Sequence, residues 1–158
     1  MKIGLVAAAV FAFLPAAHAQ QSGCDLINSI VAAAPDGFKS LQGEEIDDGW
    51  FEPKVWLVNA EECGIDLAKG SLFYCVWGAD SSAAANTKTV VLSEAVKLCL
   101  LDWTQEDIAG RLSSNNLKIV KGVGPSGAGA HAGTRMEIYT QTFEDSPESQ
   151  TWLEVSRK

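Results

Sequence analysis

Four cysteines constrain this chain more than any other feature, and two of them frame a predicted β-hairpin. Two short runs rich in β-branched and aromatic residues flank the tripeptide Ala68-Lys69-Gly70. A three-residue loop that ends in glycine is typical of a hairpin whose last loop residue has positive φ. With Leu67 opposite Ser71, Cys63 faces Cys75. Opposed residues on antiparallel strands have Cα atoms roughly 4.5–5.5 Å apart, which suits a disulfide.

The remaining two cysteines then pair with each other, as Cys24–Cys99. An even number of cysteines in an exported chain indicates disulfides, here two of them. A zinc site is the alternative, but the spacings contain no close Cys-x2-Cys pair of the kind that structural zinc sites use. We therefore expect all four sulfur atoms to be in bridges.

The first residues have the pattern of a secretion signal. Lys2 precedes an apolar run, 3–14, and Ala17-His18-Ala19 provides the small residues of a cleavage site. The apolar run is shorter than the roughly 20 residues that span a bilayer, which argues against a membrane anchor. We predict a signal peptide over 1–19 and a single disulfide-stabilised domain over 20–158, located in the periplasm or secreted.

The charge of the chain limits its partners. It has 12 basic and 20 acidic residues, a formal net charge of −8. Removing Lys2 with the signal leaves 11 basic and 20 acidic residues, a charge of −9. Nucleic acid and anionic membranes attract basic patches, so neither is an expected partner. The charge favours solubility and, secondarily, a basic protein partner. No later apolar run reaches membrane-spanning length, so no membrane insertion is expected after cleavage.

Apolar periodicity and turn signals indicate an α+β fold. We predict a single antiparallel β-sheet of about five or six strands with two helices packed on one face. Poor helix propensity over 87–91 favours a later start for the second helix. The expected helices are 24–34, 83–103 and a short one over 104–109; the expected strands are 50–57 (interrupted at Pro53), the two hairpin strands, 117–121, 135–143 and 152–155.

An acidic loop followed by two aromatic residues is the best candidate for a binding surface. The predicted loop, 43–49, lacks the residue spacing of an EF-hand, so calcium binding is not expected. Exposed aromatic side chains dominate interface energetics, and nearby carboxylates suit a basic partner. Trp77 and Trp103, in contrast, lie on apolar stripes and are expected in the core. The candidate partner-binding residues are Glu44, Glu45, Asp47, Asp48, Trp50 and Phe51.

The glycine-rich stretch from Gly122 to Gly133 contains a G-x-G-x-x-G string over 122–127. A dinucleotide site needs a helix after this string, whereas a strand is predicted here, so no nucleotide and no cofactor is expected. Ser126 and His131 lie in the same stretch and are the only pair that suggests a hydrolase. No nucleophile-elbow sequence surrounds Ser126.

These features favour an exported binding protein without catalytic activity. The sharper hypothesis is an inhibitor or immunity-type protein that neutralises a basic partner such as a cell-wall hydrolase. Two alternatives stay open: a small periplasmic hydrolase that uses Ser126 and His131, and a small-molecule carrier with a cleft between the helices and the sheet.

Overall fold

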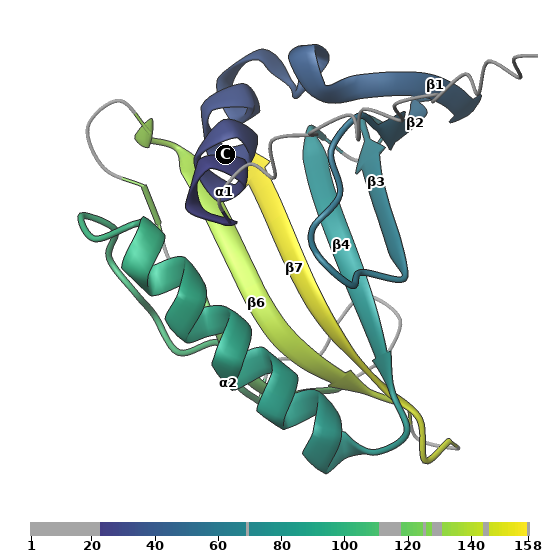
Figure 1. Ribbon diagram of the computed structural model, residues 1–158, viewed down its shortest axis with the longest axis vertical. Helices are drawn as coiled ribbons and strands as arrows, with labels where there is room; N and C mark the ends of the chain where they lie inside the picture. The colour runs from purple at the N-terminus through teal and green to yellow at the C-terminus, as the bar shows by residue number, and fades with distance from the viewer. Residues whose placement is uncertain are drawn as a thin grey trace, which may run out of the picture.

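The fold is taken from a computed structural model that describes residues 23–68, 70–110, 118–124, 126–127, 131–143 and 146–157 (Figure 1). The predicted signal peptide lies outside the described residues. The elements are α1 (Gly23–Ala33), the 3-10 turns η1 (Ala34–Asp36) and η2 (Lys39–Leu41), β1 (Gln42–Asp47), β2 (Trp50–Pro53), β3 (Glu62–Asp66), β4 (Leu72–Ala79), α2 (Ser82–Cys99), β5 (Lys118–Val123), β6 (Thr134–Thr142) and β7 (Ser149–Arg157).

One antiparallel sheet of seven strands runs in the order β1-β2-β3-β4-β7-β6-β5, which confirms the α+β class. The predicted number of five or six strands was too low. The extra strand is β1, where a loop was expected over 43–49. Carboxylates have low strand propensity, but β1 is an edge strand, and charged residues are common on edges because they discourage pairing with other chains. Next to it, β2 ends at Pro53 and does not continue to residue 57.

The predicted hairpin is confirmed as β3 and β4. Ile65 pairs with Phe73 and Cys63 with Cys75, and the Cα atoms of the two cysteines lie 4.1 Å apart in a disulfide. Gly70 has φ of +97°, as the three-residue loop requires.

Both helices bury apolar side chains in one core on the same face of the sheet, as predicted. The second disulfide, Cys24–Cys99, joins α1 to the end of α2. Trp77 and Trp103 belong to this core, with 8% and 7% of their surfaces exposed. Other core members are Ile30 and Val31 from α1, Val96 from α2, Phe73 from β4, Ile138 from β6 and Leu153 from β7.

Helix α2 differs from its predicted bounds at both ends. It begins at Ser82 because Ser81 caps it: the Ser81 Oγ accepts a hydrogen bond from the Ala84 N–H, 3.2 Å away. The helix ends at Cys99 rather than at Trp103. The low propensity of 87–91 therefore does not delay the start, because tertiary contacts of α2 override it.

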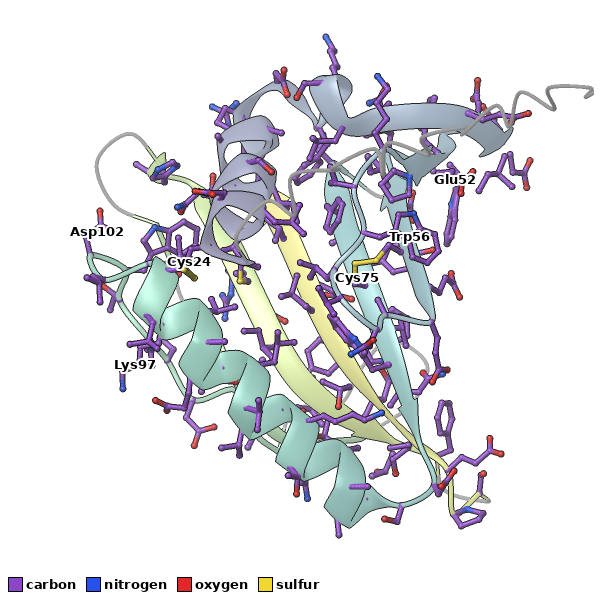
Figure 2. The ribbon with its side chains drawn as sticks, in the orientation of Figure 1. Cys24, Glu52, Trp56, Cys75, Lys97 and Asp102 are labelled. Atoms are coloured by element: carbon purple, nitrogen blue, oxygen red, sulfur yellow. A yellow bond between two sulfur atoms is a disulfide. The ribbon has the colours of Figure 1, made fainter. Side chains whose placement is uncertain are left out.

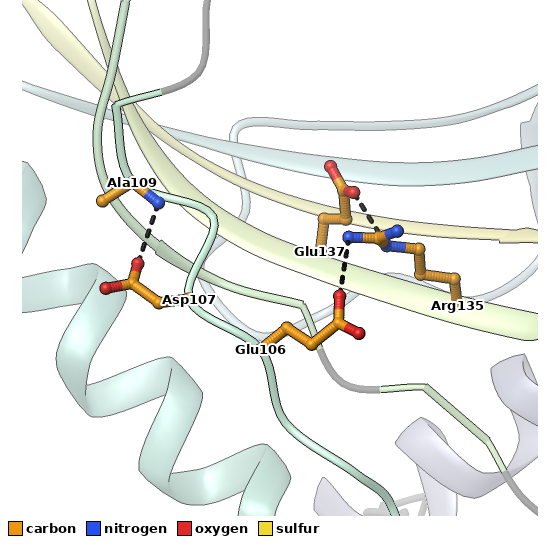
Figure 3. A network of polar contacts seen from close by, with 5 residues as sticks. All are labelled: Glu106, Asp107, Ala109, Arg135 and Glu137. Atoms are coloured by element: carbon orange, nitrogen blue, oxygen red, sulfur yellow. Dashed lines mark hydrogen bonds and ion pairs between the residues drawn. The ribbon is translucent and has the colours of Figure 1, made fainter.

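The predicted short helix over 104–109 was wrong. This segment is extended and hydrogen-bonds to β5 and the residues after it: the Ile108 N–H donates to the Gly122 oxygen, and the Gly124 N–H to the Glu106 oxygen. Arg135 on β6 reinforces the contact, since its guanidinium lies 3.6 Å from the Glu106 carboxylate and 2.9 Å from that of Glu137 (Figure 3). The backbone groups of this stretch are thus satisfied by sheet-like pairing.

Within the described residues, no helix combines the length and the apolar character needed to cross a membrane.

Candidate functional site: an apolar groove beside helix α2

The first half of α2 packs on the sheet through small and hydroxylated side chains. Thr89 is 1% exposed, and its Oγ1 lies 2.7 Å from Thr140 Oγ1 on β6. Thr151 on β7 donates its hydroxyl to the Ala85 carbonyl oxygen, 3.0 Å away. Because these polar side chains satisfy one another, they can be buried at little cost and hold α2 close to the sheet.

This packing turns larger apolar side chains of α2 away from the sheet. Val91 is 65% exposed and Leu98 is 73% exposed, and Ala95 between them is also exposed. Across from them, Val58 in the connection between β2 and β3 is 76% exposed. Clustered exposed apolar side chains mark binding surfaces more often than isolated ones do.

A groove lies between these side chains. It consists of two adjoining cavities of about 380 and 480 Å³, within the range of small-molecule sites. Both cavities are lined by Val58, Trp77, Leu92 and Ala95. Sharing four lining residues makes them one continuous concave surface between α2, the 57–59 connection and β4.

The groove differs in polarity at its two ends. At one end the lining includes the Cys24–Cys99 disulfide, with Ile27 and Leu57. At the other end it includes Thr87 and Lys88. The lining of the second end is therefore more polar than that of the first.

A hydrogen bond and a disulfide hold the walls of the groove together. The Trp77 indole N–H donates to the Val58 carbonyl oxygen, 3.1 Å away, and so ties the 57–59 connection to β4. The disulfide fixes α1 against α2 at the far end, where Figure 2 labels Cys24. Lys97, also labelled, projects from α2 to solvent and is absent from the groove lining described here. An apolar, preformed concavity is suited to binding.

The sequence pointed only partly to this groove. At helical spacing, the sequence places Leu92 and Val96 on one apolar stripe, with Val91, Ala95 and Leu98 beside it. A pattern of apolar residues wider than one stripe is a signal that part of it is left uncovered. The hydroxyl packing of Thr89 decides which part, and no periodicity encodes that choice.

The six predicted partner-binding residues lie elsewhere, and none is in the groove lining. Glu44, Glu45 and Asp47 belong to β1 and are exposed, Asp48 is in the turn that follows, and Trp50 and Phe51 begin β2.

The two aromatic residues of this set point to opposite faces of the sheet. Phe51 packs against the helix-side core, whereas Trp50 is 36% exposed and its ring lies 5.7 Å from that of Tyr74. Both residues pair with the acidic strand β1, Phe51 with Glu45 and Trp50 with Asp47, but only the Trp50 ring lies on the sheet face opposite the helices.

Trp50 is one end of a row of aromatic rings on the sheet face opposite the helices. Ring centroids are 5.7 Å apart for Trp50 and Tyr74, 5.8 Å for Tyr74 and Trp152, and 6.3 Å for Trp152 and Tyr139. Tyr74 pairs with Glu154 and Tyr139 with Trp152, which places both tyrosines on the same face of β7. The row therefore depends on the order of β4, β7 and β6, which the sequence does not state.

Carboxylates accompany the aromatic row. The Tyr74 hydroxyl donates to Glu62 at 2.7 Å, and the Tyr139 hydroxyl donates to Glu154 at 2.8 Å. Burial, reinforced by the negative charge and hydrogen bond of Glu62, raises the pKa of Tyr74 well above its usual value, so its hydroxyl stays protonated.

Ser126 and His131 lie close in the chain, in a stretch that the structure describes only in part. The Ser126 backbone pairs with Thr104, and the His131 ring lies 6.0 Å from the Trp103 ring. No hydrogen bond joins the two side chains in this described part of the chain. Part of the Gly122–Gly133 stretch is outside the described residues. The hydrolase alternative stays a prediction.

Comparison with protein-family models, with curated proteins and with solved structures finds no match for this chain.

Proposed function

We propose that this chain is an exported binding protein that holds an apolar small molecule in the groove beside α2. The observation that carries the proposal is the continuous apolar concavity of about 380 and 480 Å³. Small-molecule sites are typically preformed clefts of about 300–1,000 Å³ with mostly apolar walls and a few polar groups. The function is the carrier that the sequence left as an alternative.

A groove-filling substitution tests this function. Ala95 lines both cavities, so Ala95→Trp places an indole where they join. We expect saturable binding of the uncharged fluorescent probe N-phenyl-1-naphthylamine to wild type and at least tenfold weaker binding to Ala95→Trp.

The matched control is Ala83→Trp, an equal change at an exposed position of the same helix that does not line either cavity. It should bind the probe like wild type. Equal binding to wild type and Ala95→Trp, or no binding to wild type, contradicts the proposed function.

A second binding function is favoured by the aromatic row with its carboxylates. Trp50 joins this row at the acidic edge of the sheet, where Glu44, Glu45 and Asp47 are exposed. Cationic side chains are attracted both to aromatic faces and to carboxylates. Tyr74 and Tyr139 are buried, so a basic protein partner, such as a cell-wall hydrolase, would contact the exposed Trp50 ring and the neighbouring carboxylates of β1.

Two exposed tryptophans allow this second function to be tested. Trp50 is 36% exposed in the aromatic row, and Trp56 is 42% exposed outside it (Figure 2). Trp50→Ala should weaken binding to a purified basic cell-wall hydrolase by about 1–2 kcal/mol, whereas Trp56→Ala should not. Binding that resists high salt, or equal loss in both variants, would count against a charge-guided site.

A further inference from the structure

We infer that the ligand of the groove is an amphiphile with one hydrocarbon chain and an anionic headgroup, bound with the headgroup at Lys88. This inference rests on the proposed function, because it names the ligand class of the same groove.

The length of the groove fits one acyl chain. Its lining along α2 extends from Thr87 to Cys99, and at about 1.5 Å per residue this wall is about 18 Å long. The hydrocarbon core of a bilayer is about 30 Å thick, so one acyl chain in one leaflet covers about 15 Å. A single chain therefore matches the groove in length.

The polarity of the groove gives the chain a direction. The larger of the two cavities, about 480 Å³, is lined by the disulfide and by apolar side chains such as Ile27 and Leu98. The smaller cavity adds the polar residues Asn59, Thr87 and Lys88. A hydrocarbon tail is removed from water most completely at the apolar end, beside the disulfide. A polar headgroup can keep its hydrogen bonds at the polar end, beside Thr87 and Lys88.

The charge in the groove is opposite in sign to that of the whole chain. The chain carries 20 acidic and 12 basic residues, yet the described lining of both cavities contains one cation, Lys88, and no carboxylate. A cation in an apolar lining that contains no carboxylate is complementary to an anion, and it would repel a cationic headgroup.

Lys88 is held where a headgroup would meet it. Its ammonium donates to the Gly78 carbonyl oxygen at the end of β4, which brings the long side chain back towards the sheet. An ammonium has three N–H donors, so this one bond leaves donors that can reach a carboxylate or phosphate oxygen.

The test compares two ligands that differ in the headgroup alone. Tetradecanoate and tetradecan-1-ol have the same chain, and their affinities are measured by displacement of N-phenyl-1-naphthylamine at pH 8. For wild type we expect tetradecanoate to bind more tightly than the alcohol. Lys88→Gln should weaken the binding of tetradecanoate about two- to fivefold, the range of an exposed charge pair. The affinity for tetradecan-1-ol should stay unchanged.

Lys97→Gln is the matched control, because it removes an exposed charge from the same helix away from the lining. It should leave both affinities unchanged. Equal weakening of both ligands in Lys88→Gln, or an unchanged acid affinity, overturns the headgroup assignment while the groove still binds. Displacement by neither ligand overturns the single-chain class, and failure of the probe itself to bind wild type overturns the proposed function.

Discussion

Gly64 on β3 lies directly opposite Tyr74 on β4, and the tyrosine ring covers the glycine. A Cβ atom on Gly64 would lie 2.5 Å from the ring and from its hydroxyl oxygen, closer than atoms can approach. An aromatic ring over a strand glycine supports a position that otherwise weakens a sheet. At the scale of single residues, the aromatic row therefore depends on a glycine at position 64, where any side chain would collide with the Tyr74 ring.

Replacing this glycine is expected to disturb the row. Gly64→Ala should lower the free energy of unfolding by about 1–3 kcal/mol, because the Tyr74 ring must move and its bond to Glu62 is strained. Urea denaturation followed by tryptophan fluorescence measures the change. Gly23→Ala is the control, since nothing lies within 4 Å of an added Cβ there. Equal stability of the Gly64 variant and wild type would show that the ring contact is unimportant.

Tyr74 also predicts how stability changes in alkali. The folded state raises the pKa of its hydroxyl, while an unfolded tyrosine ionises near pH 10. Below pH 10 both states are protonated and this contribution to stability is complete. As pH rises further the unfolded state loses its proton first, so the free energy of unfolding falls.

Comparing urea denaturation at pH 8 and pH 11 isolates this contribution. Wild type should lose more stability over this interval than Tyr74→Phe, which has no hydroxyl to ionise. An equal loss in both proteins would assign the alkaline effect to other groups.

At the scale of elements, the two disulfides close loops of very different length. Cys24 and Cys99 are separated by 75 positions, and Cys63 and Cys75 by 12. The entropy of loop closure makes the first bridge worth about 4.5 kcal/mol and the second about 3 kcal/mol in the chain-entropy model. The longer bridge also joins two helices, whereas the shorter one joins strands already paired by hydrogen bonds.

Removing the two bridges is therefore expected to lower the free energy of unfolding by different amounts. The double variant Cys24→Ala with Cys99→Ala should lose more stability than Cys63→Ala with Cys75→Ala, by about 1–2 kcal/mol. Thermal or urea denaturation of the two double variants measures this difference. The reverse order would show that local geometry outweighs loop length.

Much of the element order follows from the sequence because several local signals agree. The hairpin register and both disulfides were predicted correctly, since Gly70, the strand pattern and the cysteine spacing point to the same pairing. The α+β class follows from apolar periodicity and turn signals. Features that are determined by residues close together in the sequence can be predicted without a structure.

What could not be predicted depends on contacts between distant segments. The strand β1 forms from carboxylate-rich sequence because β2 offers it a partner, and 104–110 is extended because β5 and the residues after it accept its backbone. The groove lies beside a helix that packs on the sheet through long-range contacts such as that of Thr89 with Thr140, 51 positions apart in the sequence. The different faces of Trp50 and Phe51 have a local cause instead, because strand alternation places neighbouring side chains on opposite faces.

At the scale of the whole molecule, the two sides of the sheet differ in character. The helix-covered side contains the apolar core and the groove, and the other side has the aromatic row with carboxylates. The proposed small-molecule site and the proposed surface for a basic partner are thus on opposite sides. Binding at one leaves the other accessible.

Ligand binding should stabilise the entire fold, since the groove joins α1, α2 and the sheet. At one hundred times its dissociation constant, a ligand adds about 2.7 kcal/mol to the free energy of unfolding, which corresponds to a rise in Tm of about 5–10 °C. Calorimetry with tetradecanoate measures the rise. Ala95→Trp should show little increase, and a similar increase in both proteins would indicate binding outside the groove.

Under the proposed function, the bridge between Cys24 and Cys99 would give the maturation of this protein an order. The Cys24–Cys99 disulfide lines one end of the groove, and disulfides form in oxidising compartments. A newly synthesised chain with reduced thiols has an incomplete wall there and would retain a hydrocarbon chain poorly. Under the proposed function, export precedes loading, and the molecule collects its cargo outside the cytoplasm instead of carrying it out.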